Sequence, residues 1–243
     1  MNRGAAPGEW RRRRSLRRAL SDIPHQIGTT REANSAPHSV APVQRFYKYQ
    51  AAIYDLTRWT LLLGRNNAVD AMRLRTDASV LEIGCGTGLN FSPIQRRLDS
   101  THGHIVGVDF SEHMLKRARR RVERRGWRNV DLCAADATRL DLGRQFDAVF
   151  FAYSLSMIPD WRLALERAAA HLAPGGRIVV LDFGRFEKWG PMARVMRGFL
   201  RVNHVKILDG VDSALRTHCE HVTVQHALGG HHAVWMGVRS NDV

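Results

Sequence analysis

The chain has 243 residues, of which 44% are hydrophobic and 25% are charged, close to the averages of soluble globular proteins. This length suits one domain with an appendage, and no uncharged apolar run approaches the roughly 20 residues that a membrane-spanning helix needs. The formal charge of +14, from 37 basic and 23 acidic residues, favours contact with anionic lipid or another polyanion. The three cysteines lack the paired spacing of a zinc site or a disulfide framework, which fits a reducing cytosol.

Residues 1 to 42 are predicted to form a disordered basic tail. Eight arginines and three acidic residues lie there, and the later part is rich in Ser, Pro, Asn and Thr without apolar periodicity. The segment offers no apolar core for a secretory signal, so export is not expected. The arginines fit attachment to anionic lipid or nucleic acid, a simply solvated run, or a start codon set too far upstream.

Residues 43 to 243 are predicted to form one α/β domain. From Phe46 onwards, apolar residues recur every three or four positions, which predicts an N-terminal helical cap. Strand-like and helix-like segments then alternate, and two final strands flank Gly229–Gly230 as in an antiparallel hairpin. We therefore expect a Rossmann-like, doubly wound sheet of seven mostly parallel strands. The expected strands are 79–83, 105–108, 130–134, 146–151, 177–181, 221–226 and 233–238, and the expected helices are 91–98, 111–125 and one that begins after Asp160 as N-cap.

A glycine-rich loop follows the first expected strand. Glycines at 84, 86 and 88 give the spacing G-x-G-x-G, whereas the dinucleotide fingerprint needs its third glycine at the position of Leu89. Glu82, at the end of the strand, attracts a sulfonium or an amino group and repels a pyrophosphate. The loop thus favours S-adenosylmethionine over a dinucleotide, with a plain tight turn as the alternative for the loop alone.

Two further acids follow the next two strands. Asp109 ends the second strand, 21 residues after Gly88, where a carboxylate can accept hydrogen bonds from both ribose hydroxyls. Asp136 follows the third strand, where it can accept from the adenine amino group while the N–H of Ala137 reaches a ring nitrogen. Because the loop and Asp109 agree, the plain-turn alternative becomes much weaker.

These segments resemble the class I methyltransferase family across about residues 46 to 240, with Glu82 to Gly88, Asp109 and Asp136 matching its successive motifs. The resemblance implies S-adenosylmethionine as cofactor and S-adenosylhomocysteine as product. Met114 also lies on the apolar stripe of its own helix, so core packing stays open for it. The predicted cofactor-binding residues are Glu82, Gly84, Cys85, Gly86, Gly88, Asp109, Phe110, Met114, Asp136, Ala137 and Tyr153.

The nine residues from Tyr153 to Trp161 resemble bacterial betaine-lipid N-methyltransferases, as do residues 53–58, 63–65 and 182–184. That resemblance implies trimethylation of the amine of diacylglyceryl-homoserine, with a separate aminocarboxypropyl transferase as the upstream enzyme. A phosphatidylethanolamine N-methyltransferase is the close alternative. The chain lacks the [DNS]-P-P-[YFW] motif of amino-methylating nucleic-acid enzymes, so no specific nucleic acid is expected. Its arginine-rich tail nevertheless keeps a nucleic-acid-binding methyltransferase as a rival.

The substrate residues are predicted from the chemistry of an amine. Methyl transfer to nitrogen requires alignment and dehydration but no protein nucleophile, and a tyrosine or a water can take the proton that the amine loses. Aromatic faces hold a quaternary cation, and a pair of arginines seven residues apart suits the homoserine carboxylate. Core packing and solvated arginines are the competing interpretations. The catalytic candidates are Tyr54 and Tyr153, the substrate-binding candidates are Arg58, Arg65, Trp161 and His204, and Trp59 is a further aromatic candidate.

The segment from Pro191 to Leu208 carries apolar residues at helical spacing, with arginines and a lysine among them. It fits a helix lying in a membrane interface and equally a helix packed on the sheet. We expect a cytoplasmic, peripherally membrane-associated enzyme that meets its lipid at an anionic surface. His231–His232 stand where the betaine-lipid family has an aromatic residue, and no histidine pair has the carboxylates or thiolates of a closed site, so no metal is expected.

Overall fold

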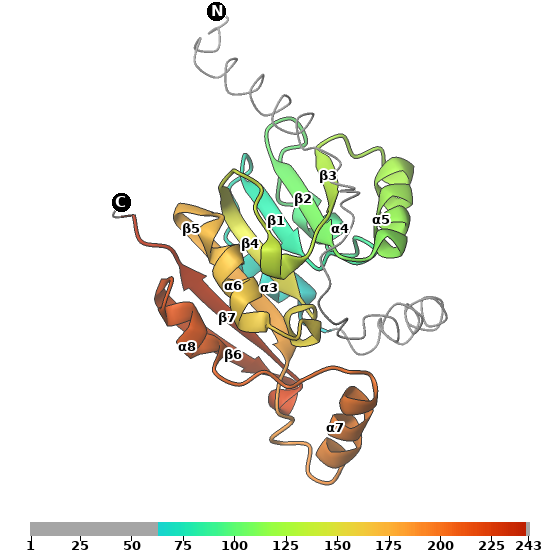
Figure 1. The fold of residues 1–243 in the computed structure, drawn as a ribbon, viewed down its shortest axis with the longest axis vertical. Coiled ribbons are helices and arrows are strands. Elements are labelled where there is room, and N and C mark those ends of the chain that lie inside the picture. Colours follow the sequence, from blue (N-terminus) through green and yellow to red (C-terminus); the bar gives the residue numbers. More distant parts are fainter. Residues whose placement is uncertain (1–62, 242–243) are drawn as a thin grey trace, which may run out of the picture. The chain divides into compact units, whose positions relative to one another are not determined.

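The computed structural model describes residues 63–241 of the chain, and helices and strands carry the labels of Figure 1. The predicted tail, the predicted cap helix from Phe46, and the candidates Tyr54, Arg58 and Trp59 lie outside the described residues. Within residues 63–241, no helix is both long and apolar enough to cross a membrane.

A seven-stranded sheet forms the centre of the domain (Figure 1). The strand order is β3-β2-β1-β4-β5-β7-β6, in which β7 runs antiparallel to β5 and β6 and the other neighbours run parallel. The order confirms the predicted α/β fold and its terminal antiparallel pair. The strands are β1 (Ser79–Ile83), β2 (His104–Asp109), β3 (Val130–Ala134), β4 (Phe146–Ala152), β5 (Leu172–Phe183), β6 (Glu220–Ala227) and β7 (His232–Val238).

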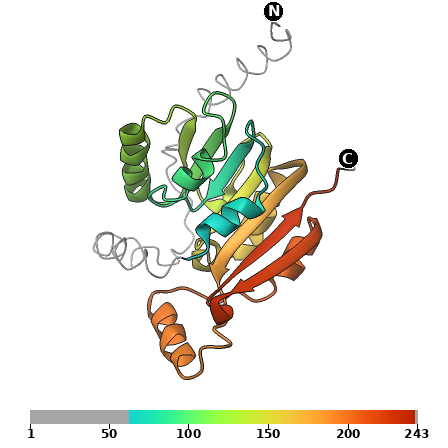
Figure 2. The ribbon, with the colours of Figure 1, turned by 180° about the vertical axis from the view of Figure 1, so that it is seen from behind.

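Helices cover both faces of the sheet, as a doubly wound fold requires. One face carries α3, α4 and α5, and the other carries α6 and α8, as comparison of Figures 1 and 2 shows. Helix α7 stands beyond the carboxyl end of β5 in both views. The helices are α3 (Arg65–Ala71), α4 (Phe91–Gln95), α5 (Glu112–Arg125), α6 (Trp161–Ala170), α7 (Met192–Val202) and α8 (Val211–Arg216), with short 3-10 turns η1 (Ala137–Arg139), η2 (Leu155–Met157) and η3 (Leu228–Gly230).

Side-chain caps start α5 and α6, and the cap at Asp160 is the one that the sequence predicts. The hydroxyl of Ser111 accepts a hydrogen bond from the N–H of Met114 at the start of α5, and Asp160 accepts one from the N–H of Leu163 at the start of α6. Gly126 ends α5 in a left-handed conformation with φ 65°, which glycine adopts without a Cβ clash. By contrast, α4 ends earlier than predicted.

Two apolar cores lie on the two faces of the sheet, and β4 contributes to both. Phe150 packs into the core that includes α3, α4 and α5, whereas Phe151 packs into the core that includes α6 and α8. Both side chains are fully buried, and each burial contributes about 1.5–3 kcal/mol. Because both faces of the strand are covered, its sequence is a continuous apolar run rather than an alternating one.

Strand β5 begins earlier than the sequence predicts. Its bounds include Pro174–Gly176, a Pro-Gly-Gly sequence that predicts a turn before the strand 177–181. The pairing with β4 shifts there, since Phe146 pairs with Leu172 but Ala148 pairs with Arg177. The predicted turn chemistry is therefore present, but it forms a bulge within a longer strand.

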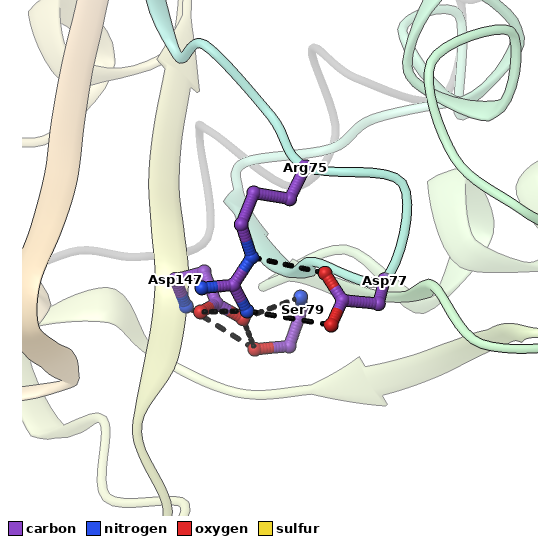
Figure 3. A network of polar contacts seen from close by, with 4 residues as sticks. All are labelled: Arg75, Asp77, Ser79 and Asp147. Atoms are coloured by element: carbon purple, nitrogen blue, oxygen red, sulfur yellow. Dashed lines mark hydrogen bonds and ion pairs between the residues drawn. The ribbon is translucent and has the colours of Figure 1, made fainter.

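A polar network ties the amino ends of β1 and β4 together, as Figure 3 shows. Asp147 accepts hydrogen bonds from both the N–H and the hydroxyl of Ser79, at 2.8 and 2.7 Å. Arg75 lies 3.0 Å from a carboxylate oxygen of Asp77 and 3.7 Å from one of Asp147. Exposed ion pairs of this kind add little stability alone, so the main effect of the network is to fix two central strands at the edge opposite the glycine loop.

Replacing Gly64 with alanine is expected to lower the free energy of unfolding by about 3 kcal/mol, as strain and overpacking add together. Gly64 caps α3 with φ 80°, and an added Cβ would lie 2.3 Å from Nε2 of His232, whose side chain is buried. Gly126→Ala is the matched control, because its φ is 65° but its Cβ would meet nothing within 4 Å. Urea denaturation measures both variants, and equal losses would show that the contact with His232 contributes nothing.

Candidate active site

The glycine loop begins where β1 and β2 separate. The N–H groups of Gly84 and Cys85 both donate to the carbonyl of Val108, at 2.8 and 2.9 Å, and the N–H of Gly88 donates to the carbonyl of Cys85 at 2.9 Å. Gly84, Gly86 and Gly88 have φ values of 70°, 57° and 72°, which residues with a Cβ rarely adopt. The sequence therefore needs glycine at each of these positions to form this loop.

The three glycines differ in what surrounds them. A Cβ on Gly84 would lie 2.4 Å from the Cβ of Ser154, and one on Gly88 would lie 2.5 Å from the ring of Phe91. A Cβ on Gly86 would meet nothing within 4 Å. Gly84 and Gly88 thus permit tight packing inside the protein, whereas Gly86 is the point at which the loop backbone borders open space and can approach a ligand.

Asp109, at the end of β2, holds this loop in place. One carboxylate oxygen, Oδ2, accepts from the N–H of Gly86 at 2.8 Å, and the other, Oδ1, accepts from the N–H of Ser111 at 2.8 Å. The next residue, Phe110, is exposed, whereas Met114 is buried. The ring of Phe110 is thus available to cover a ligand. Met114 lies in the protein interior, which agrees with the core packing that its place on the apolar stripe of the helix left open.

Asp136 lies at the corresponding end of β3, next to the turn η1. Its Oδ1 accepts hydrogen bonds from both the N–H and the hydroxyl of Thr138, at 2.9 and 2.8 Å. The residue is exposed and both bonds use the same oxygen, so Oδ2 remains available to a further donor. This geometry is compatible with the predicted contact to an adenine amino group.

Glu82 is completely buried beside the loop. Its Oε1 accepts from the side-chain amide of Asn90 at 2.7 Å, whose oxygen in turn accepts from Arg65 at 3.0 Å, and its Oε2 has no hydrogen-bond partner among the described residues. Burial raises the pKa of Glu82 to about 8, against the opposing effects of Asn90 and Arg65. A buried acceptor without a donor indicates a ligand, and a cationic amino or sulfonium group meets both its charge and its geometry. The site therefore fits S-adenosylmethionine.

Tyr153 begins the loop after β4 in an unusual backbone conformation, with φ 55°. Its hydroxyl donates to the carbonyl of Leu63 at 2.6 Å, which connects β4 to the start of α3. Burial, reinforced by the nearby carboxylate of Asp182, raises the pKa of the Tyr153 phenol. Asp182 is itself buried and accepts from the N–H of Ser156 at 2.9 Å, which fixes the loop. Tyr153 thus keeps its proton and positions the chain around it.

An aromatic cluster continues from Tyr153 towards η3, and the sequence analysis did not assign it. The Tyr153 ring centroid lies 4.8 Å from that of Phe183, and His231 lies 5.9 Å from Phe183, 5.6 Å from Phe186 and 5.6 Å from Trp189. The sequence feature that points to this cluster is the pair His231–His232, which stands where the betaine-lipid family has an aromatic residue. The imidazole of His231 takes that position as a ring.

The two imidazoles of His231 and His232 lie against each other, with their Nδ1 atoms 3.2 Å apart. Both are buried, and burial lowers the pKa of each, with the neighbouring His232 lowering that of His231 further. The pair is therefore uncharged at neutral pH and adds no positive charge to this edge of the sheet.

Of the three predicted substrate-binding residues that the structure describes, only Arg65 lies at the site. Its guanidinium donates to the side-chain oxygen of Asn90, beside Glu82. Trp161 is buried in the core on the α6 side of the sheet, with the guanidinium of Arg162 stacked 4.3 Å above its ring, so it does not join the Tyr153 cluster. His204 is exposed after α7, with φ 57°. Within residues 63–241, no three His, Cys, Asp or Glu side chains gather as a metal site would require.

Comparison with known proteins agrees with this geometry. A family model described as a methyltransferase domain matches residues 80–176, which contain the glycine loop, Asp109 and Asp136. A demethylmenaquinone methyltransferase from Listeria welshimeri is 32% identical over 119 residues, which cover 49% of this chain and 50% of that protein. The chain thus spans about half the length of this relative.

Two further likenesses cover more of the domain. A phosphatidylethanolamine N-methyltransferase from Cereibacter sphaeroides is 32% identical over 161 residues, covering 65% of this chain and 76% of that protein. The crystal structure of an S-adenosylmethionine-dependent methyltransferase from Aquifex aeolicus matches the fold with a TM-score of 0.60 and 17% identity, over 78% of this chain and 97% of that one. With the family model and the cofactor geometry, these likenesses show that the chain belongs to the class I methyltransferase family, whose cofactor is S-adenosylmethionine.

Proposed function

We propose that the protein is an N-methyltransferase that trimethylates the amine of diacylglyceryl-homoserine at the cytoplasmic surface of a membrane. The observation that carries a lipid amine as substrate is the 32% identity that extends over 76% of the phosphatidylethanolamine N-methyltransferase from Cereibacter sphaeroides. The homoserine headgroup is supported by the segment from Tyr153 to Trp161, which resembles betaine-lipid enzymes. A separate aminocarboxypropyl transferase would supply the homoserine lipid.

The cofactor supplies an electrophilic methyl group on a sulfonium, so that the amine nitrogen gains a carbon bond as the carbon–sulfur bond breaks and the amine loses a proton. The protein's part is to bind, align and exclude water. Gly86 lets the backbone approach the cofactor, Asp109 holds the loop, and buried Glu82, which carries a proton in the free protein at neutral pH, becomes a carboxylate opposite the cationic groups when they bind.

We assign binding of the substrate's amine headgroup to the region around Tyr153 and Arg65. Tyr153 holds its own proton in the bond to Leu63, so we assign it a positioning role and leave the substrate proton to Tyr54 or a water. The aromatic rings near Tyr153 suit a methylated ammonium, which each face stabilises by about 0.5–2 kcal/mol. Arg65, with Arg58 upstream, is the candidate for the homoserine carboxylate, because the planar guanidinium matches a carboxylate with paired N–H groups and Arg65 lies at the site through its contact with Asn90.

Phosphatidylethanolamine is the second candidate substrate, favoured by the name of the Cereibacter relative. The two lipids present the same primary amine and differ in the neighbouring anion, which is a carboxylate in one and a phosphate in the other. The same cofactor site serves both, so only the arginine contacts separate them.

The test is to incubate the purified full chain with methyl-labelled S-adenosylmethionine and one acceptor at a time. The acceptors are vesicles containing diacylglyceryl-homoserine, vesicles containing phosphatidylethanolamine, RNA, and phosphatidylcholine vesicles that carry no free amine. We expect label to pass through mono-, di- and trimethylated homoserine lipid. Label confined to phosphatidylethanolamine would transfer the assignment to the second candidate, and label confined to RNA would overturn the lipid assignment while leaving the fold and cofactor unaffected.

The variant Tyr153→Phe tests the positioning role in the same assay. It removes only the hydroxyl that donates to Leu63, so we expect kcat to fall about tenfold or more while the dissociation constant of S-adenosylmethionine changes less than twofold. An unchanged kcat would contradict the role of Tyr153.

A further inference from the structure

Helix α7 exposes an apolar face to solvent. Met192, Val195, Phe199 and Val202 recur at intervals of three and four, so they share one face, and they are 55%, 65%, 44% and 72% exposed. Helix α7 packs on the protein through a different face, which carries the buried Ala193 and Leu200. The sequence allowed either packing or interface contact for this segment, and the structure shows that packing uses only part of its apolar surface.

The exposed face continues onto the turn η3. The indole N–H of Trp189 donates to the carbonyl of Leu228 at 2.8 Å, and the N–H of Met192 donates to the carbonyl of Trp189 at 3.1 Å. Leu228 is itself 58% exposed. Of the eight large apolar side chains that are exposed within residues 63–241, five therefore lie on α7 and η3. Exposed apolar clusters of this kind mark interaction surfaces rather than ordinary solvent-facing positions.

The charges from residue 188 to residue 206, a range that includes α7, have one sign, whereas the exposed Glu187 lies beside η3. Between positions 188 and 206 the sequence contains five lysines and arginines and no acidic residue. The basic residues are Lys188, Arg194, Arg197, Arg201 and Lys206. Such a helix, with an exposed apolar face and a separate cationic face, complements an anionic bilayer, in which the apolar side chains enter the acyl boundary and the cations meet lipid phosphates.

The same charge argues against a cover from within the chain. Residues 1–62 contain eleven arginines and lysines but only four acidic residues, and the protein as a whole carries a formal charge of +14. The excess of basic residues makes that segment and a second copy less favourable partners for the five cations between 188 and 206 than an anionic bilayer.

We propose that α7 and the exposed side chain of Leu228 form the docking surface of this protein for anionic membranes. The inference deepens the proposed function, on which it rests for its biological purpose, by naming the surface through which a lipid substrate is reached. Helix α7 follows β5 from the same carboxyl edge of the sheet that carries Tyr153 and the glycine loop. A membrane bound there meets the catalytic edge and not the Arg75–Asp147 edge shown in Figure 3.

The test measures binding of the full chain to vesicles of phosphatidylcholine with 30 mol% phosphatidylglycerol, in the absence of cofactor and of any amine lipid. Replacing Phe199 by glutamate should lower the partition coefficient roughly tenfold, since one apolar anchor is lost and a like charge is added at the surface. Val224→Glu is the matched control, because Val224 is 42% exposed on β6 and the substitution changes the charge equally. We expect it to change binding less than twofold.

A second pair of substitutions tests the cationic face. Arg194→Gln with Arg201→Gln should weaken binding to anionic vesicles by roughly fivefold per arginine and leave binding to pure phosphatidylcholine unchanged. Equal effects of Phe199→Glu and Val224→Glu, or a wild-type chain that does not bind anionic vesicles, would overturn the proposal. A wild-type dimer that Phe199→Glu converts to a monomer, without vesicle binding, would show instead that a second copy covers α7.

The docking proposal and the proposed function can be contradicted independently of each other. The vesicle-binding assay contains no substrate, so an error in the assigned lipid headgroup would not change its result. Conversely, Phe199→Glu should methylate lipid dispersed in detergent micelles at the wild-type rate, which isolates docking from chemistry.

Discussion

Replacing Asp109 by alanine is expected to raise the dissociation constant for S-adenosylmethionine at least a hundredfold. Each of its carboxylate oxygens accepts a backbone N–H, from Gly86 and from Ser111, and the same group is the candidate acceptor for the ribose hydroxyls. Hydrogen bonds to a charged group contribute about 1.5–3 kcal/mol each, and a hundredfold change corresponds to about 2.7 kcal/mol. Isothermal titration of the full chain measures the change.

Two variants make this result specific. Asp109→Asn retains the shape and one acceptor but must turn an NH2 group towards an N–H donor, so an intermediate loss is expected. Asp131→Ala removes a carboxylate from the neighbouring strand β3, where its contact is with His104, and should leave cofactor affinity unchanged. If Asp109→Ala bound the cofactor as tightly as Asp131→Ala, the assignment of the β2 acid would be wrong.

The affinity for S-adenosylmethionine should rise about tenfold from pH 6 to pH 7, because of Glu82. Its pKa in the free protein is raised to about 8 by burial, so at neutral pH the group carries a proton. A cationic ligand stabilises the carboxylate and lowers this pKa, so binding releases a proton and becomes more favourable as the pH rises. Titrations at the two pH values, in buffers of different ionisation enthalpy, measure both the affinity and the released proton.

Glu82→Gln is the matched control for this pH dependence. Glutamine has the shape of the protonated acid and can still accept from Asn90, but it does not titrate, so affinity should become independent of pH over this range. The free wild-type protein should also lose stability as pH rises from about 5 to 8, since the folded pKa exceeds the ordinary value of 4.5. A slope that persists in the variant would assign the proton to another group.

Local sequence signals predicted the sheet well where one residue type dictates the backbone. The strands 79–83 and 130–134 have the predicted bounds, and Asp160 caps its helix as expected. The strand β5 was harder, because Pro174–Gly176 favours a turn equally before a strand and in a bulge within one. The order of the last two strands was also beyond local patterns, since alternation predicts a hairpin but not which of its strands joins the sheet.

In the candidate site, too, the features within one local unit were predictable from the sequence and the contacts between distant residues were not. The glycine loop and Asp109 were predictable, since their spacing along the chain reflects a single strand–loop–helix unit. The chain of contacts from Arg65 through Asn90 to Glu82 was not, because Arg65 and Asn90 are 25 residues apart and no periodicity relates them. Likewise, Trp161 was assigned to the substrate because it ends the segment from Tyr153 to Trp161 that resembles betaine-lipid enzymes. Its ring is instead buried in the core on the α6 side of the sheet, which the sequence pattern did not predict.

The position of β7 determines when the site becomes complete during synthesis. β7 is the last strand described, yet it lies between β5 and β6, so β6 has no neighbour in the sheet until β7 has emerged from the ribosome. His232, its first residue, packs against Gly64 at the start of α3. The catalytic edge therefore includes a contact between the first and last described elements, and a nascent chain lacking β7 has an unpaired β6 and lacks the contact of His232 with the start of α3. Pairing over such a long separation is slow, which makes this final strand the natural point at which folding, and hence activity, is completed.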